Sequence, residues 1–173
     1  RMFQQFVILV SMVFLSSCFS NKESSSILRD HTAKVLIMLA PECPLCKNYT
    51  KDIKEMQAKY SQEITFYGIV PGSYYSAQEV DSFLNSYNLP LNIIFDADLS
   101  LCKALNATVT PEVFFIDENN TIRYRGMFDN WLGELGRRRL VVTQYYLRDA
   151  LDAYLKGTDI NIKKTKAVGC FIE

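Results

Sequence analysis

The sequence lacks the features that mark several large functional classes. Lys and Arg total 19 and Asp and Glu total 19 among 173 residues, so neither sign of charge dominates. This balance excludes the class of strongly basic nucleic-acid-binding proteins, which are recognised by the positive electrostatic field of the whole molecule. No apolar run is long enough for an ordinary multi-span membrane protein. A four-ligand zinc site normally needs a second pair of Cys or His ligands. The chain has a single histidine, His31, and does not offer such a pair.

The composition that remains suits one packed domain. Hydrophobic residues make up 49% of the chain and aromatic residues 13%, which argues against a disordered chain. We therefore expect one globular domain that follows a separate N-terminal segment.

The N-terminal segment has the pattern of an export signal. Residues 6–15 are apolar apart from Ser11, which is short for a transmembrane helix and typical of a signal-peptide core. The run ends in Leu-Ser-Ser-Cys, which resembles a bacterial lipobox whose cysteine, here Cys18, carries the lipid. We expect residues 1–17 to be a lipoprotein signal peptide and residues 18–30 a flexible tether. The alternative is an ordinary secretory signal with an incidental cysteine.

The hydrophobic pattern then alternates between strand and helix periods. Residues 33–40 are almost continuously apolar, as in a strand buried on both faces, and residues 44–60 repeat apolar side chains at helical spacing. We expect further strands at residues 63–70, 92–95, 112–117 and 121–125, and further helices at residues 76–87, at residues 98–106 capped by Asp98, and from Thr143 to Gly157. This alternation predicts an α/β domain with a mainly parallel central sheet and an antiparallel edge.

The motif Cys43-Pro44-Leu45-Cys46 lies at the junction of the first strand and the first helix. Unpaired amides and the positive end of the helix dipole stabilise a thiolate there, so Cys43 is the candidate nucleophile. Cys46 lies one turn further on, within reach of a disulfide, and Pro44 suits a first helical turn. Half a zinc site, a structural disulfide or two buried thiols are the other interpretations of the motif.

The chain resembles the thioredoxin superfamily, and most closely the membrane-anchored thiol–disulfide oxidoreductases of the TlpA type and related redoxin-domain proteins. The resemblance covers roughly residues 33–126 and rests on LIMLA, CPLC, SAQEVDSFLNSYNLP and IIFDADLSLCKALNATVTPEVFFID. It implies a thioredoxin-like fold, a central mixed sheet flanked by helices, with an inserted helix between strands. It also implies a redox domain at residues 31–157, a C-terminal tail at residues 158–173, and a cis Thr110-Pro111 peptide bond placed against the CxxC motif.

Two departures from the family pattern concern proton transfer. Glu42 occupies the position of a usual tryptophan, and Ile37 occupies the position of a buried acid found in many thioredoxins. Glu42 is a candidate general base by proximity, although a plain exposed carboxylate explains it equally well. Its negative charge would also raise the pKa of Cys43.

The other cysteines leave alternatives open. Cys102 lies among leucines of a short helix and is interpreted as a buried, inert thiol. Cys170 either returns to the active site as a third thiol or staples the tail through Cys102. Residues 127–142 have no counterpart in a minimal thioredoxin and form either a partner-binding patch or a solvated loop over an apolar edge.

The leading prediction is a lipid-anchored thiol–disulfide oxidoreductase of the bacterial envelope, facing the periplasm or the outer membrane. It would exchange disulfides with substrate proteins through Cys43 and Cys46 and take electrons from an upstream donor, without cofactor, metal or nucleic acid. A peroxiredoxin-like peroxidase is the second candidate, although Leu36 and Ala40 replace the expected Pro and Thr or Ser. A Sco-like copper-binding assembly protein is the third, although it would need wider cysteine spacing and a downstream His.

Overall fold

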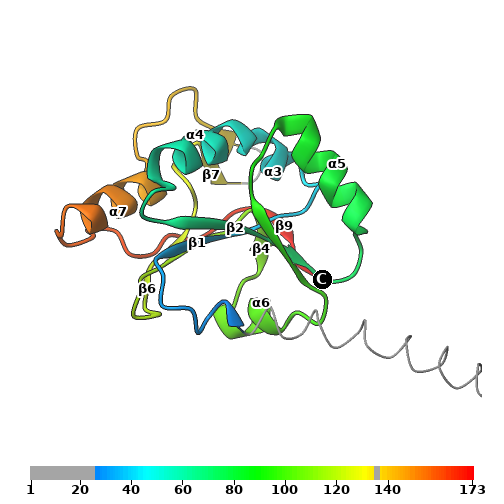
Figure 1. The fold of residues 1–173 in the computed structure, drawn as a ribbon. Coiled ribbons are helices and arrows are strands. Elements are labelled where there is room, and N and C mark those ends of the chain that lie inside the picture. The colour runs from blue at the N-terminus through cyan, green and yellow to red at the C-terminus, as the bar shows by residue number, and fades with distance from the viewer. Residues whose placement is uncertain (1–25, 135–136) are drawn as a thin grey trace, which may run out of the picture.

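The computed structural model describes residues 26–134 and 137–173, and its centre is a mixed five-stranded sheet. The strand order is β3-β2-β1-β5-β6. Strands β1 (Lys34–Met38), β2 (Thr65–Pro71) and β3 (Asn92–Asp96) are parallel, whereas β5 (Val113–Ile116) and β6 (Ile122–Gly126) form an antiparallel hairpin at the other edge. The predicted α/β class, the thioredoxin-like arrangement and the antiparallel edge are confirmed (Figure 1). The signal peptide, Cys18 and most of the predicted tether lie outside the described residues.

Strand β1 is buried throughout, as its apolar sequence predicts, yet it contains one charged residue. The Lys34 side chain is 0% exposed and donates to the carbonyl oxygens of Ile27 and Asp30 and to Oδ1 of Asn120. Burial is the main cause of a lowered Lys34 pKa, which the nearby Asp30 opposes. Lys34 thereby ties the segment before the strand, and the β5–β6 turn, to the start of the central strand.

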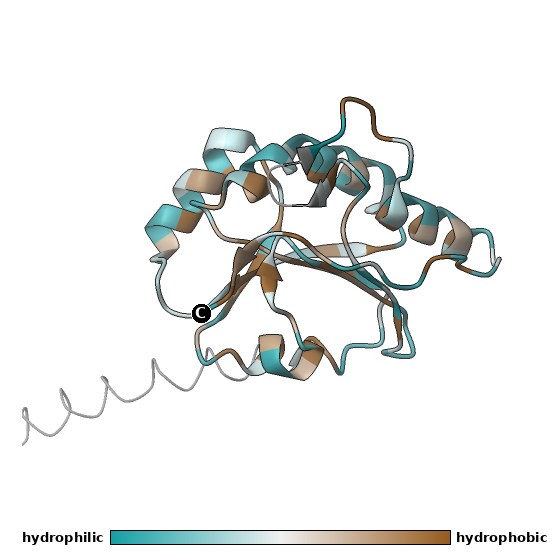
Figure 2. Ribbon diagram, turned by 180° about the vertical axis from the view of Figure 1, so that it is seen from behind, coloured by the Kyte–Doolittle hydropathy of each residue, from teal (hydrophilic) through white to brown (hydrophobic). Residues whose placement is uncertain are grey.

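Four helices of the described chain cover one face of the sheet, which is the face on which the CxxC motif lies. These are α3 (Pro44–Asn48), α4 (Thr50–Tyr60), α5 (Ala77–Tyr87) and α7 (Tyr146–Leu155). Their apolar sides pack on Val35, Ile37 and Phe115 of the sheet in one hydrophobic cluster. In Figure 2 the central strands are mostly hydrophobic, whereas the outer helix surfaces carry the hydrophilic residues. The Ser76–Glu79 capping box at the start of α5 is present as its spacing predicts.

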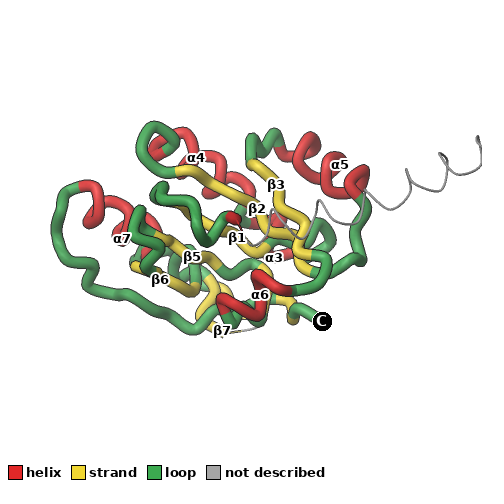
Figure 3. Tube along the Cα trace, turned by 60° about the horizontal axis from the view of Figure 1, so that its bottom comes forward, coloured by secondary structure: helices red, strands yellow, loops and turns green. Residues whose placement is uncertain are grey.

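Among the described residues, the opposite face carries the short helix α6 (Ser100–Leu105) and the turn around Ile27. Figure 3 shows α6 on the side of the sheet away from α4 and α5. The predicted cap of this helix is incomplete. Asp98 does accept from the Ser100 N–H at 3.1 Å, but the buried Asp96 accepts from the N–H groups of Leu101 and Cys102 at 3.0 and 2.8 Å.

Two helix boundaries differ from the expectation. The predicted helix at residues 44–60 is divided at Tyr49, which ends α3 and begins α4 with φ −84° and ψ 0°. The last helix begins at Tyr146 rather than Thr143, because the Thr143 hydroxyl accepts from the Asn130 side chain at 2.7 Å. The Thr143 N–H also donates to that side chain, at 3.0 Å, so Thr143 belongs to the preceding loop.

Two small sheets complete the described structure. Strands β7 (Leu132–Glu134) and β8 (Arg137–Arg138) pair antiparallel. Strand β4 (Val109–Thr110), which precedes β5, pairs antiparallel with β9 (Cys170–Phe171) from the tail. This second pairing brings the end of the described chain to the CxxC motif. No helix within the described parts is long and apolar enough to cross a bilayer.

Candidate active site

Cys43 is placed by the turn between β1 and α3. Its N–H donates to the Ala40 carbonyl at 3.0 Å, and its φ of −66° and ψ of 118° make it the extended cap residue before the helix. Pro44 is the first helical residue, where its missing N–H costs nothing. Cys43 is 4% exposed and lines a cavity.

Cys46 lies one turn into the same helix and is entirely enclosed. Burial raises the pKa of the Cys46 thiol to about 11, because a thiolate loses its hydration there. Hydrogen bonds from the Ala40 amide and the Thr110 hydroxyl act in the opposite direction, but they are the smaller effects. Cys46 is therefore a protonated, free thiol held against the inner side of Cys43.

Thr110 is the common neighbour of these two cysteines. Its carbonyl oxygen lies 3.2 Å from the Cys43 Sγ, and its hydroxyl reaches Cys46. The Thr110-Pro111 bond is cis, as the resemblance implies. Thr110 and Pro111 are both buried, and Thr110 places both its backbone carbonyl and its hydroxyl beside the cysteines.

Cys170 returns to the active site. It forms a disulfide with Cys43 across a sequence separation of 127 residues, with a Cα–Cα distance of 6.3 Å. Of the two alternatives left open for Cys170, the structure adopts the one at the CxxC motif. Cys43 and Cys46 are close but are not bonded to each other in this state.

Cys102 has no part in this site. It lies on α6, in the hydrophobic cluster on the opposite face of the sheet, with its Sγ 3.9 Å from the Met38 sulfur. Burial first, and the adjacent Asp96 second, raise the pKa of its thiol to about 12. Both effects agree with the interpretation of Cys102 as an inert core thiol.

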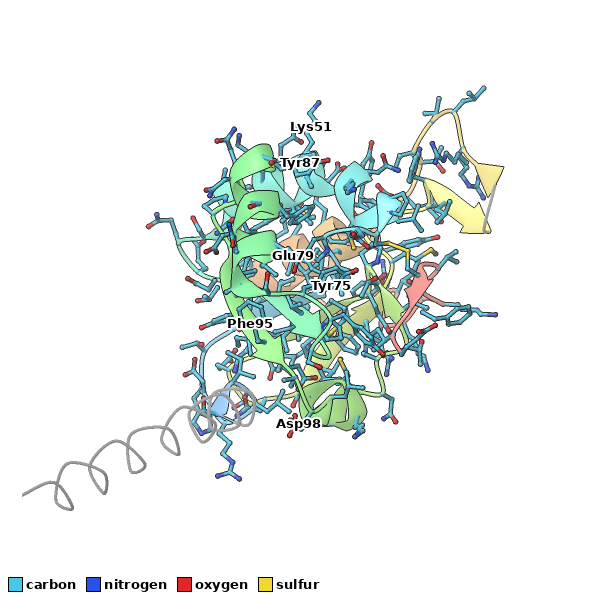
Figure 4. All side chains as sticks on the ribbon, turned by 90° about the vertical axis from the view of Figure 1, so that its right-hand side faces the viewer. Lys51, Tyr75, Glu79, Tyr87, Phe95 and Asp98 are labelled. Carbon is cyan, nitrogen blue, oxygen red and sulfur yellow. A yellow bond between two sulfur atoms is a disulfide. The ribbon has the colours of Figure 1, made fainter. Side chains whose placement is uncertain are left out.

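A cavity of ≈ 530 Å³ opens beside the cysteines. One wall consists of Cys170 and the three residues that follow it, and the other consists of the β2–α5 loop and the start of α5, with Tyr74, Tyr75 and Glu79. Tyr75 and Glu79 lie between α5 and β9 in Figure 4. Burial, and secondly the charge of Glu42, raise the pKa of Tyr75. No sequence pattern predicted this wall, because the exposed Tyr74 and the half-buried Tyr75 lie in a loop without a period.

Glu42 is exposed at the rim of this cavity. Its position satisfies the exposed-carboxylate interpretation, and among the described contacts it makes no hydrogen bond to either cysteine of the motif. A negative charge at the rim still acts on groups nearby, as the raised pKa of Tyr75 shows.

Two acidic side chains, Asp52 and Asp129, lie near Tyr49 at the α3–α4 junction. The Tyr49 hydroxyl donates to Asp129 at 2.8 Å, and burial, followed by the charge of Asp129, raises the pKa of Asp52. Trp131 packs edge-on against Tyr49 at 5.7 Å, so the segment at residues 127–142 begins by covering the α3–α4 junction. Further along this segment, Leu140 and Val141 are exposed. The sequence missed Asp129 because it comes from a region without a family counterpart.

No three His, Cys, Asp or Glu side chains in the described residues gather as a metal site would require.

Comparison with known proteins agrees with this geometry. The sequence profile of the AhpC/TSA family matches residues 18–125. The chain belongs to the AhpC/TSA family, and its class is that of redoxin-domain, thioredoxin-like, thiol-based oxidoreductases. Comparison with curated proteins finds no match.

Several solved structures share the fold. A hypothetical protein from Sinorhizobium meliloti is 25% identical, with a TM-score of 0.72 over 85% of this chain and 82% of that one. An uncharacterized conserved protein from Geobacillus kaustophilus is 23% identical, with a TM-score of 0.72 over 84% and 79%. StoA from Bacillus subtilis is 18% identical, with a TM-score of 0.50 over 57% and 75%.

Proposed function

We propose that this protein is a thiol–disulfide oxidoreductase that exchanges disulfides with other proteins through Cys43 and Cys46. The observation that carries the proposal is the environment of the Cys43 sulfur. It is bonded to the sulfur of an extended polypeptide segment that is itself paired with β4. This is the arrangement that a mixed disulfide with a polypeptide substrate requires.

The exchange follows from the positions of the two thiols. The Cys43 thiolate attacks one sulfur of a substrate disulfide, forms a mixed disulfide and releases the other substrate sulfur as a thiolate. Cys46 then loses its proton and attacks the Cys43 Sγ from the inner side. The products are a Cys43–Cys46 disulfide and a reduced substrate that has gained two electrons. An upstream dithiol donor must return those electrons, and the reverse sequence oxidises substrate thiols.

We further propose that the domain works in a bacterial envelope, tethered by a lipid on Cys18. The lipobox pattern and the signal-peptide-like run before it support this location. The test is to express the full chain in a bacterium with Cys18→Ala and follow its partition between membrane and soluble fractions. We expect the parent chain in the membrane fraction and the variant outside it.

A disulfide-linked reporter peptide, with dithiothreitol as reductant, tests the exchange on a domain that begins near Ser24. We expect Cys43→Ser to abolish turnover and Cys46→Ser to accumulate a mixed disulfide visible as a mass adduct. Cys102→Ser is the matched control, because Cys102 is equally buried but lies on the opposite face of the sheet. Equal turnover by the parent and by Cys43→Ser would contradict the proposal.

One observation favours a second candidate, a two-cysteine thiol peroxidase. A disulfide between an early and a late cysteine is also what such an enzyme would form after peroxide oxidises Cys43. Against it, Ala40 stands where a peroxide-binding hydroxyl is expected. Stoichiometric hydrogen peroxide separates the candidates, since oxidation of Cys43 no faster than that of an ordinary cysteine excludes the peroxidase.

A further inference from the structure

The tail, residues 158–173, is fixed to the domain before it reaches Cys170. The Arg125 N–H donates to the Lys163 carbonyl at 3.1 Å, and the Thr165 N–H donates to the Arg125 carbonyl at 3.0 Å. Neither bond involves the disulfide. Only residues 166–169 separate this anchor from Cys170, so a reduced Cys170 would stay near the active site at a high effective concentration.

Beyond the anchor, the tail adds a strand to β4. Cys170 pairs with Thr110, and the Ile172 N–H donates to the Thr108 carbonyl at 3.0 Å. Strand addition of this kind satisfies backbone groups that a second polypeptide could otherwise pair with. The tail therefore occupies the place where the proposed function would dock an extended substrate.

Gly169 makes this close pairing possible. A Cβ atom built on Gly169 would lie 2.7 Å from the carbonyl carbon of Thr110, closer than real Cβ contacts come. The two backbones nearly touch, so a larger residue cannot enter without displacing the strand. This position controls the docking of the tail without being a thiol.

Cys43 therefore has two sulfur neighbours in the same chain. Cys170 approaches from the β4 edge and is bonded to it, whereas Cys46 lies inside the helix as a free thiol. A disulfide with a free thiol beside it is set up for exchange.

We propose that Cys170 is a third redox thiol and that the tail is an internal substrate that closes the active site. This inference rests on the proposed function. Cys46, once deprotonated, attacks the Cys43 Sγ; the Cys43–Cys170 bond breaks, the Cys43–Cys46 bond forms, and Cys170 leaves as a thiolate that takes a proton from water. The number of disulfides is unchanged, so no external oxidant or reductant is needed. The oxidised protein thus has a closed form, with Cys43–Cys170, and an open form, with Cys43–Cys46.

The closed form excludes polypeptides but leaves room for small molecules. The cavity beside Cys43 keeps ≈ 530 Å³ while Cys170 and the residues after it form its wall. A small thiol can reach the cysteines there, whereas a protein substrate needs the β4 edge that the tail covers. The tail would then select which reaction partner meets Cys43.

Disulfide mapping in glutathione buffers, by alkylation and mass spectrometry, tests the first part. We expect the parent domain to form both Cys43–Cys170 and Cys43–Cys46. Cys46→Ser should form the first alone, and Cys170→Ser the second alone. If the parent never forms Cys43–Cys170 while Cys43–Cys46 and substrate exchange persist, the inference is overturned and the proposed function stands. If no variant forms a disulfide at Cys43 or exchanges with substrate, the proposed function itself fails.

Gly169→Val tests the closure without changing a thiol, and Gly133→Ala is its control because a Cβ there meets nothing within 4 Å. Gly169→Val and Cys170→Ser should both reduce a polypeptide disulfide faster, by roughly fivefold or more, because a tethered competitor has been removed. Reduction of a small aromatic disulfide should change much less. Equal rates with the polypeptide in the parent and both variants, each shown to be folded by circular dichroism, would overturn the closure.

A synthetic peptide of residues 167–173 gives a second measurement. The peptide is supplied as its symmetrical disulfide, so that in a Cys46→Ser and Cys170→Ser domain the Cys43 thiolate should attack it, form a mixed disulfide and release one reduced peptide. The same peptide with valine in place of Gly169 should react more slowly. Equal reaction of the two peptides would contradict docking through the β4 edge.

Discussion

The Thr110 hydroxyl donates a hydrogen bond to the buried Cys46 thiol, while the carbonyl oxygen of the same residue lies 3.2 Å from the Cys43 sulfur. One residue of β4 therefore acts on both thiols of the CxxC motif. The hydroxyl favours the Cys46 thiolate, which is the species that must form before Cys43 can be released.

We predict that Thr110→Val slows the release of a mixed disulfide by Cys46. Valine keeps the branched shape but removes the donor, and loss of a hydrogen bond to a charged sulfur should slow this step by about tenfold or more. Rapid quenching of a Cys43 mixed disulfide, followed by alkylation, measures the rate. Thr110→Ser restores a hydroxyl and should recover most of it; equal rates for the valine and serine variants would rule out the hydrogen bond as the cause.

The same step should depend steeply on pH. The pKa of Cys46 is raised to about 11, so below that value the thiolate is a minor species whose fraction grows with pH. We expect the rate to rise by about tenfold per pH unit between neutral pH and pH 10 and to level off near pH 11.

A nitrothiobenzoate adduct on Cys43 of the Cys170→Ser domain provides the absorbance signal for this profile. Cys46→Ser should show no intramolecular release at any pH. A profile that levels off near pH 7 would mean that Cys46 is activated by a group that the described contacts do not include.

Asp96 should contribute more to stability than Asp98, although both precede α6. Asp96 is 0% exposed and accepts from two helix amides, whereas Asp98 is exposed and accepts from one. Asp96→Ala leaves two buried donors without a partner and should lower the free energy of unfolding by about 2–4 kcal/mol. Asp98→Ala should change it little. Urea titrations of the two variants provide the comparison, and similar losses in both would refute this assignment.

These cases also show what the sequence could predict. The continuous apolar run before Cys43 and the Ser76–Glu79 spacing are local patterns, and they located β1 and the start of α5. The choice between Asp96 and Asp98 depends on which carboxylate is buried under the first turn of α6, which no local pattern contains. For the same reason, a buried strand could be predicted around Lys34, but not the carbonyl groups that its ammonium binds.

The residues of the candidate site also fall into those that the sequence could predict and those that it could not. Cys43, Pro44 and Cys46 are adjacent in sequence, and their position between a strand and a helix was enough to single them out. Thr110 and Pro111 came from the family pattern. Cys170 lies 127 residues from Cys43, so its place could be left only as an alternative until the fold brought β9 to β4.

The pairing of β9 with β4 also bears on how the protein is handled. Glu173 forms part of the cavity wall, so any residues attached after it, natural or fused, would leave the domain at the opening above Cys43. An affinity tag at that end would crowd the opening and bias the balance of the two disulfides. A tag placed before Ser26 would start beside α6, on the face of the sheet away from the cysteines, and would leave the redox chemistry undisturbed.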